Sequence, residues 1–212
     1  KDYGFFLDKK TIVIHNGIDT SVFKKRTHEH KNKFIVTSHL RFSKGIQDLL
    51  MAVYELPNEL KNSIEIDVFG EGPYENELKV LVSESDLNHK IQFLGYRTDI
   101  EAILDKSDLF FHPSILPDPL PTVLFEAIKM KVPLAATELE GVVEILDNGN
   151  CGLLVPHSNP KKAADMINNY YKDDKLKTSN TEKAIEHINK HFSPSQFNKN
   201  ILNLFKTTIS PK

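Results

Sequence analysis

Short apolar runs rich in Val, Ile and Phe alternate along the chain with longer segments in which apolar residues recur every three or four positions. The short runs predict strands, because β-branched and aromatic residues favour an extended backbone and buried parallel strands are apolar on both faces. The predicted strands cover residues 11–15, 34–38, 64–69, 91–94, 109–112, 132–136 and 151–155.

The longer segments have the period of an amphipathic helix. In the first of them, Ile46, Leu49, Leu50 and Val53 form one apolar stripe. The predicted helices cover residues 46–56, 75–85, 98–106, 122–130, 159–172, 182–191 and 195–207. Two polar stretches, residues 24–33 and 172–180, have neither period and are predicted to be connections.

This alternation of strands and helices, followed by terminal helices, determines the expected fold class. It predicts a mainly parallel sheet with helices on both faces. No repeat, low-complexity segment or linker divides the sequence. We therefore predict an α/β fold consisting of a single Rossmann-like domain over residues 1–212. In such folds ligands bind beyond the carboxyl ends of the strands, so the chemistry is expected in the loops there.

Two cations follow the strand predicted at 34–38. Lys44 stands at the start of a helix, and Arg41 lies three positions earlier. Cations beside a helix N-terminus form a site for an anion, most often phosphate. The alternative is a pair of solvated charges on an exposed loop, and the spacing alone leaves both interpretations open.

A glycine-containing turn follows the strand predicted at 64–69. Gly70 and Gly72 precede a helix, but Glu75 stands where a dinucleotide fingerprint requires its third glycine. An NAD site is therefore disfavoured. The two glycines either form a tight strand-to-helix turn or let the backbone approach a ligand.

Two carboxylates lie eight positions apart. Asp118 belongs to a proline-rich loop, and Glu126 lies in the apolar helix that follows. A carboxylate on the inner side of such a helix needs a partner. Glu126 is therefore expected in a buried ion pair, in a cap, or as an acceptor of hydrogen bonds from ligand hydroxyls. Pro121 and Thr122 open the helix, whose free amides would face an anion.

Composition narrows the class of protein. The 27 basic and 29 acidic residues give a net charge of −2, which offers no reason to expect nucleic acid as a partner. The lone cysteine, Cys151, excludes an intrachain disulfide and a cysteine-rich zinc site. His187 and His191 have the spacing of helical metal ligands, but the sequence shows no third ligand near them. We therefore expect no metal.

Taken in order, these segments resemble the C-terminal, donor-binding domain of GT-B glycosyltransferases of family 4. The resemblance runs from about Ile12 to about Phe205. Asp118 and Glu126 fall on the family's E-x7-E positions. The other matching segments are V-I-H-N-G-I-D (13–19), S-H-L-R-F-S-K-G (38–45), F-G-E-G-P (69–73), F-L-G-Y (93–96), S-D-L-F-F-H-P-S (107–114) and the loop at 141–144.

The resemblance implies a role for each matching side chain. Glu126 would hold the ribose hydroxyls of a nucleotide, and Asp118 would hold hydroxyls of the donor sugar. Lys44, together with Arg41 or His39, would neutralise the diphosphate. Lys44, Asp118 and Glu126 would thus be the catalytic set, because preorganised cations stabilise the charge that the departing nucleotide diphosphate acquires.

The backbone has implied roles as well. Amides around Leu120, Thr122 and Val123 would face phosphate, and the backbone of Gly95-Tyr96-Arg97 would pack beside the base. The resemblance further implies transfer with retention at the anomeric carbon and without a metal. No cofactor is then expected, since the nucleotide-diphosphate sugar is the donor substrate.

Two residues depart from the family pattern. The first acidic position is Asp118, which is shorter than Glu by one methylene, or about 1.5 Å of reach. His39 stands where an arginine often precedes the lysine, and Arg41 can supply that charge from two positions further on. Both departures bear on which donor is bound.

A GT-B enzyme has two Rossmann-like domains, and this sequence matches only the second. We therefore expect an N-terminal domain of the same polypeptide that is absent from this chain and carries most acceptor contacts. The implied partners are a nucleotide sugar and a glycan or lipid-linked acceptor, with no nucleic acid. By family analogy the setting is bacterial surface polysaccharide or lipopolysaccharide synthesis, in the cytoplasm or at the inner face of the membrane.

Two alternatives belong to other classes. The chain could be a stand-alone nucleotide-binding subunit that pairs with a separate acceptor subunit, or part of a GT-B-shaped sugar-nucleotide epimerase. On the main hypothesis, the isolated chain binds nucleotide weakly and transfers no sugar.

Overall fold

The computed structural model describes residues 12–19, 32–85 and 87–209. Its centre is a six-stranded sheet in the order β3-β2-β1-β4-β5-β6, and every neighbouring pair of strands is parallel. The strands are β1 (Lys33–Thr37), β2 (Glu65–Phe69), β3 (Ile91–Phe93), β4 (Leu109–His112), β5 (Leu134–Thr137) and β6 (Leu153–Val155). The predicted parallel α/β sheet is confirmed.

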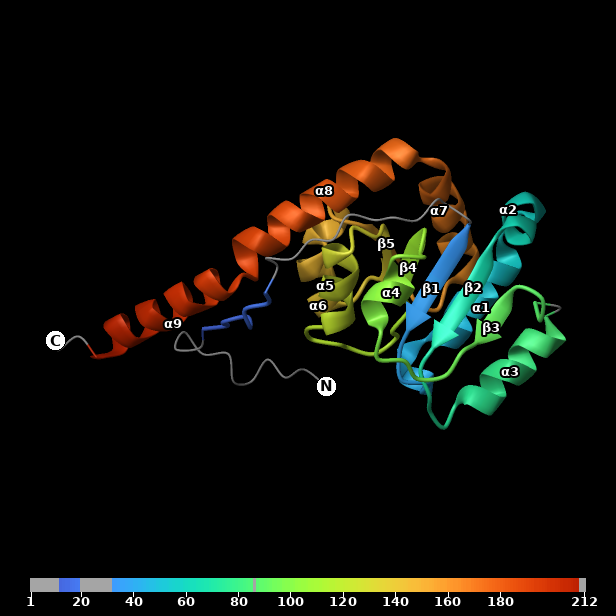
Figure 1. Cartoon of the computed structure of the whole chain (residues 1–212), viewed down its shortest axis with the longest axis horizontal. Coiled ribbons are helices and arrows are strands. Elements are labelled where there is room, and N and C mark those ends of the chain that lie inside the picture. Colours follow the sequence, from blue (N-terminus) through green and yellow to red (C-terminus); the bar gives the residue numbers. More distant parts are fainter. Residues whose placement is uncertain (1–11, 20–31, 86, 210–212) are drawn as a thin grey trace.

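Helices connect the strands, and α7, α8 and α9 follow the last strand (Figure 1). They are α1 (Ile46–Glu55), α2 (Asn58–Ser63), α3 (Glu75–Glu84), α4 (Ile100–Leu104), α5 (Thr122–Lys129), α6 (Glu140–Ile145), α7 (Pro160–Lys172), α8 (Asp174–His191) and α9 (Pro194–Ile209), with 3-10 turns η1 (Phe42–Lys44) and η2 (Asp147–Gly149). Within the described ranges, none of these helices combines the length and the apolar character that a membrane span requires. Figure 1 shows α9 continuing from α8 away from the sheet.

The sheet separates two hydrophobic cores. Successive side chains of a strand point to opposite faces. In β1, Phe34 and Val36 accordingly pack with α1, α3 and α7, whereas Ile35 packs with α4, α5, α6 and α8. Both faces are therefore covered, which is why the strands are apolar throughout and why the helices divide between two layers.

The prediction of a strand at 11–15 is wrong for the part of that range that the structure describes. Residues 12–19 form no strand, and the side chains of Ile12 and Val13 are 61% and 68% exposed. The segment lies instead against the C-terminal helices, where the amide of Ile18 donates to the carbonyl of Phe192 at 2.7 Å. A β-branched run becomes a strand only when it pairs with a sheet edge, and this one pairs elsewhere. Residues 24–31 of the predicted loop lie outside the described residues.

The polar stretch predicted to connect two helices is itself helical. The Oδ1 atom of Asp173 accepts a hydrogen bond from the amide of Leu176 at 2.8 Å and so caps the start of α8. Further along, the buried Asn180 donates from Nδ2 to the carbonyl of Asn150 at 2.5 Å. A cap and one buried polar contact thus take the place of the missing apolar period. Two short helices, α2 and α6, were not predicted because neither spans enough residues to show a period.

Two glycines allow the loops at the carboxyl ends of the strands to touch. Gly45 has a φ of +67°, and a Cβ there would lie 1.9 Å from the carbonyl oxygen of Pro113. Gly70 has a φ of +131°, and a Cβ there would lie 1.8 Å from the carbonyl oxygen of Ser38. The first glycine joins the loop after β1 to the loop after β4, and the second joins it to the loop after β2.

We predict that Gly45→Ala lowers the free energy of unfolding by more than the roughly 1 kcal/mol that left-handed backbone alone costs a residue with a side chain, because the new methyl group collides with Pro113. Gly95→Ala is the matched control, since its φ is +69° but its nearest contact would be 3.8 Å away. Urea denaturation of both variants measures the difference. Equal losses would mean that the two loops are not closely packed.

Candidate functional site

The strand order reverses between β1 and β4. β1 pairs with β2 on one side and with β4 on the other, and the chain builds the β2–β3 half before it returns. At such a point the loops after the two central strands run in opposite directions and leave a crevice at the carboxyl edge. The loop after β1 carries Lys44, and the loop after β4 carries Asp118. The topology thus brings together two residues that lie far apart in the sequence.

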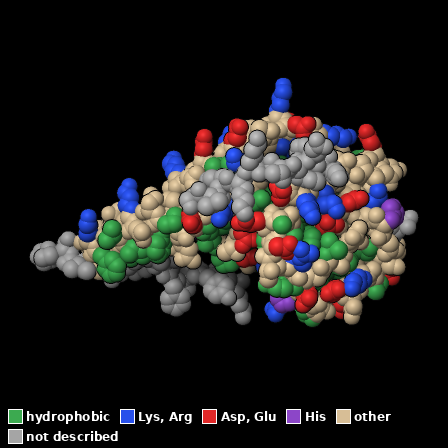
Figure 2. All heavy atoms as spheres, in the orientation of Figure 1, with side chains coloured by type: hydrophobic (Ala, Val, Ile, Leu, Met, Phe, Trp, Pro, Cys, Tyr) green, Lys and Arg blue, Asp and Glu red, His purple; other side chains and the backbone are tan. Residues whose placement is uncertain are grey.

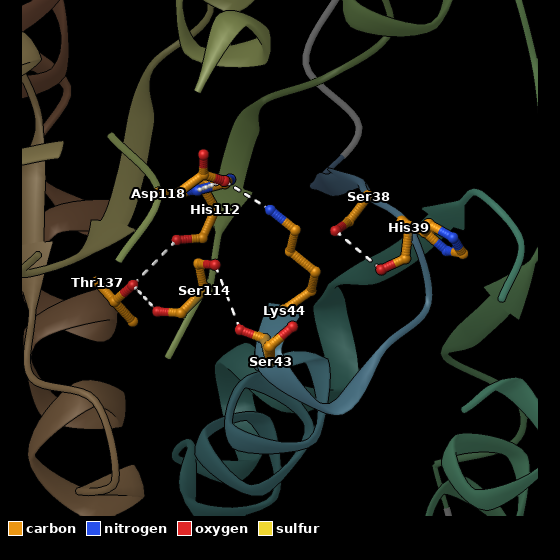
Figure 3. A network of polar contacts seen from close by, with 8 residues as sticks. All are labelled: Ser38, His39, Ser43, Lys44, His112, Ser114, Asp118 and Thr137. Carbon is orange, nitrogen blue, oxygen red and sulfur yellow. Dashed lines mark hydrogen bonds and ion pairs between the residues drawn. The ribbon is translucent and has the colours of Figure 1, made fainter. Parts of the chain in front are cut away.

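An ion pair spans this crevice. The Nζ atom of Lys44 lies 2.6 Å from Oδ2 of Asp118, and the two side chains are 29% and 22% exposed. Lys44 ends the 3-10 turn η1 directly before α1, which holds its backbone against the sheet. Figure 3 shows the lysine side chain pointing to the carboxylate, with a dashed line marking the contact. A cation and a carboxylate that face each other from opposite loops can separate to receive a ligand carrying both phosphate and hydroxyl groups.

His112, the last residue of β4, lies beneath this pair. Its side chain is 4% exposed, and its Nε2 atom lies 3.7 Å from Oδ2 of Asp118, without a hydrogen bond within the described chain. Burial lowers the pKa of His112 to about 4; Asp118 opposes this shift and Lys44 adds to it. The imidazole is therefore neutral at pH 7. Sequence analysis gave His112 no role, although a polar residue that ends an otherwise apolar strand is a usable signal.

A chain of hydrogen bonds ties the surrounding loops together (Figure 3). The carbonyl of Ser43 accepts from the amide of Ile115 at 3.0 Å and from the hydroxyl of Ser114 at 3.3 Å. The hydroxyl of Thr137, at the end of β5, in turn donates to the carbonyl of Ser114. The loops after β1, β4 and β5 are therefore one connected unit beneath the ion pair.

A cavity of about 460 Å³ opens beside the loop after β1. It brings together six of the residues singled out in the sequence: His39, Tyr96, Arg97, Thr122, Val123 and Glu126. The remaining lining residues are Thr37, Ser38, Phe69, Gly70, Glu71 and Ile100. Arg41, Gly95 and Leu120, which the sequence also singled out, lie on the same loops but do not line the cavity, and neither do Lys44 and Asp118.

The position of Glu126 differs from the one expected from the sequence. It was placed on the inner side of α5 with a partner there, but its side chain is exposed at the cavity, and no ion pair or cap is found for it in the described chain. The apolar neighbours in its sequence face the core, whereas Glu126 itself points away from it. Partial burial raises the pKa of Glu126, Glu101 adds to the shift, and Lys129 opposes it. The carboxylate is thus available to a ligand in the cavity.

The loop after β3 borders the same cavity. The carbonyl of Gly95 accepts from the amide of Gly70 at 2.8 Å, which fixes this loop against the loop after β2. Arg97 makes a two-point contact with Asp99, at 2.7 and 2.5 Å, and the guanidinium lowers the pKa of the Asp99 carboxyl. The Arg97 side chain is therefore already paired, which leaves its backbone and the exposed Tyr96 ring as the parts that can meet a ligand.

A metal site in the crevice or the cavity would need several ligating side chains that converge on one point. Among the described residues, no group of three or more His, Cys, Asp and Glu side chains converges on the crevice or on the cavity. The site offers the Lys44–Asp118 pair, the exposed Glu126 carboxylate and the uncapped start of α5, which together suit a ligand with an anionic part and a polyhydroxyl part.

Comparisons with known proteins point in the same direction. The family model described as "Glycosyl transferases group 1" matches residues 18–187. The putative colanic acid biosynthesis glycosyltransferase WcaL of Salmonella typhimurium is 24% identical over 210 residues, which cover 94% of this chain and 52% of that protein. An N-acetylgalactosaminyltransferase of Campylobacter jejuni that acts on a diphospho-undecaprenol is 27% identical over 181 residues, with coverage of 83% and 48%. The chain spans about half the length of these curated relatives.

Solved structures share the fold. HepE of Anabaena, in complex with UDP and glucose, superimposes with a TM-score of 0.82 at 23% identity, covering 94% of this chain and 57% of that one. WaaG, a glycosyltransferase involved in lipopolysaccharide biosynthesis, gives a TM-score of 0.74 at 16% identity, with coverage of 95% and 56%. The likeness thus extends over nearly all of this chain and over one half of each neighbour.

We predict that His112 makes stability depend on pH. Its pKa of about 4 in the folded chain lies below the roughly 6.5 of an unfolded histidine. Between these values the unfolded chain binds the extra proton, so stability present at pH 7.5 is lost as the pH falls, by up to about 2 kcal/mol at pH 5. Urea unfolding at the two pH values should show a smaller loss in His112→Gln. The exposed His157→Gln should keep the full loss, and parallel behaviour of both variants would contradict the buried neutral imidazole.

Proposed function

Because the chain belongs to the family of glycosyl transferases group 1, we propose that it is the donor-binding half of a retaining, metal-independent glycosyltransferase. The observation that carries this proposal is the convergence of Lys44 and Asp118 at the reversal of the strand order, beside a cavity that Glu126 lines. In this proposal the cavity binds the nucleoside of a nucleotide-diphosphate sugar, and the ion pair binds its diphosphate and sugar.

The cavity suits the nucleoside. Its volume of about 460 Å³ lies within the range of small-ligand sites. The Glu126 carboxylate would accept hydrogen bonds from the ribose hydroxyls, and the backbone from Gly95 to Arg97 would lie along the base. The Tyr96 ring, 68% exposed, is free to cover the base. Within the described residues Glu126 makes no ion pair, so its carboxylate is available for this role.

The crevice suits the diphosphate and the sugar. Lys44 supplies a cation, and no side chain within the described ranges caps the start of α5, where Thr122 and Val123 offer their amides. Asp118 would turn from Lys44 toward sugar hydroxyls when phosphate takes its place beside the lysine. As the sugar–phosphate bond breaks, negative charge grows on the diphosphate, and the fixed cation and amides stabilise it. Because His112 beneath is neutral, it adds no positive charge that would hold Asp118 in place.

The acceptor would bind to a second domain that this chain does not contain. WcaL is named for colanic acid biosynthesis, and the Campylobacter relative for a diphospho-undecaprenol acceptor. These names support a glycan or lipid-linked acceptor in bacterial surface polysaccharide synthesis. The exposed apolar side chains Leu202 and Phe205 on α9 fit a contact with that second domain. Figure 2 also shows basic and acidic side chains mixed over this face, which gives nucleic acid no continuous basic surface.

Glu126→Ala should abolish or strongly weaken nucleotide binding. We expect one nucleotide among UDP, GDP, ADP and CMP to bind in calorimetry without magnesium; HepE, which is known with UDP and with UDP-glucose, makes UDP the first to test. Loss of hydrogen bonds to a charged group costs about 1.5–3 kcal/mol, or roughly 10- to 150-fold in Kd. Glu77→Ala, on exposed α3, is the control. Equal binding by both variants would remove Glu126 from the site.

Lys44→Met should weaken binding of the nucleoside diphosphate more than binding of the nucleoside, because it removes charge beside the phosphates and leaves Asp118 to repel them. The expected ratio between the two effects is about tenfold or more at low salt, and it should shrink as salt screens the charges. Lys79→Met is the matched control, since Lys79 makes an ion pair of the same length, 2.6 Å, with Glu75 away from the site. A uniform loss for both ligands would place Lys44 outside the phosphate site.

A further inference from the structure

A second cluster of reactive side chains lies at the far end of α6. This helix begins beside the Asp118 loop, where a Cβ on Gly141 would lie 2.2 Å from the carbonyl oxygen of Pro119, and it leads into the turn η2. In and after η2 stand Asp147 and Cys151, and His187 of α8 faces them. The ligand atoms of these three side chains all lie within 4.8 Å of one another. The crevice and this cluster are therefore at opposite ends of the same helix.

The burial of the cluster is unequal. The Cys151 side chain is 2% exposed, whereas Asp147 and His187 are half-buried. No hydrogen bond or ion pair joins the three side chains, all of which lie in the described part of the chain. Asp147 accepts only from the Asn150 amide, at 3.1 Å, among the recorded hydrogen bonds of its side chain. Mutual pairing therefore does not explain why a thiol, a carboxylate and an imidazole face one another.

One hydrogen bond of His187 matches the pattern found in metal-ligating histidines. Nε2 of His187 lies 2.9 Å from the carbonyl oxygen of Glu144, so in the neutral ring this nitrogen donates and Nδ1 keeps the lone pair. Ligating histidines characteristically donate their other ring N–H to a carbonyl or carboxylate in this way, which fixes both tautomer and ring direction. Glu144 lies about one helical turn before Asp147 in the sequence. The same segment therefore supplies both the orienting carbonyl and the carboxylate.

We propose that Asp147, Cys151 and His187 form a binding site for a thiolate-binding divalent cation of the Zn²⁺ class. One sulfur, one nitrogen and one oxygen suit zinc or cobalt, whereas magnesium and calcium prefer oxygen alone. Ligand atoms around a tetrahedral zinc ion lie about 3.3–3.6 Å apart, so closure needs a contraction of about 1 Å by the two half-buried side chains. His191, one turn beyond His187 with ring centroids 4.7 Å apart, is placed to be the fourth ligand in competition with water.

The site would act as a structural clamp. The loop between α6 and β6 already touches α8 at the buried Asn180, which donates to the carbonyl of Asn150. His187 lies two helical turns further along α8, next to the buried Ile188. An ion bound there would hold α8 to the loop at a second point and would leave Lys44, Asp118 and Glu126 untouched. The proposal is thus independent of the proposed glycosyltransferase function.

Cobalt absorption tests the ligand set on the purified chain. One equivalent of Co²⁺ should produce the visible bands of a tetrahedral site together with a thiolate-to-cobalt charge-transfer band. The charge-transfer band should vanish in Cys151→Ser, and Zn²⁺ should displace the cobalt. His187→Gln, which can still donate to Glu144, should weaken Zn²⁺ binding by at least about tenfold, whereas the exposed His157→Gln should not change it. Cobalt bands without a thiolate contribution, or Zn²⁺ affinity equal in all variants, would overturn the proposal.

Thermal unfolding provides a second readout. Zn²⁺ should raise the midpoint of unfolding of the parent chain, because it binds the folded state, and should raise it much less in Asp147→Asn and His187→Gln. These two positions are half-buried, so their variants keep the test decisive even if Cys151→Ser does not fold. An unchanged midpoint in the parent chain, or the same rise in every variant, would overturn the proposal.

Discussion

The pairing of β1 with two partners is the constraint on which this structure depends. β1 is held by β2 along its whole length and by β4 on the other side, so it has no free edge and no free face. Because every strand is parallel, all the carboxyl ends meet at one edge. The reversal of strand order beside β1 then parts the loops that follow β1 and β4. The crevice is a consequence of that topology, and the side chains in it inherit their positions from the strands.

The charge state of His112 and the pairing of its neighbours depend on how deeply each side chain is buried. His112 is buried beneath the ion pair and stays neutral, because the effect of burial on its pKa outweighs that of the nearby carboxylate. Lys44 and Asp118 lie closer to solvent and form the ion pair. Glu126 is exposed at the cavity and forms no ion pair with any of the described residues. The site therefore combines a buried neutral imidazole, an ion pair and an exposed carboxylate, which suits a ligand that enters with its anionic part toward the pair and its hydroxyl-rich parts toward the carboxylates.

Sequence analysis found the elements that local patterns encode and missed those that depend on distant partners. Six of the predicted strands are present. Their apolar β-branched runs favour an extended backbone and are buried on both faces of the parallel sheet. The run at 12–15 has the same composition but no sheet edge to join, and no local pattern reveals that. Likewise, the pattern located Lys44 and Asp118 but could not show that they pair across 74 positions. Cys151 and His187 were dismissed as ligands one by one, since only the packing of α8 brings them together.

The hydrogen bonds and glycine contacts between the loops limit which segments can be exchanged between related chains. The Ser43 carbonyl holds the loop after β4, Gly45 leaves no room for a side chain beneath Pro113, and Thr137 ties in the end of β5. The three loops behave as a single exchangeable block. A segment around Lys44 transplanted alone from a related chain would arrive without its partners. Recombination between relatives would therefore succeed most readily where all three loops come from the same parent.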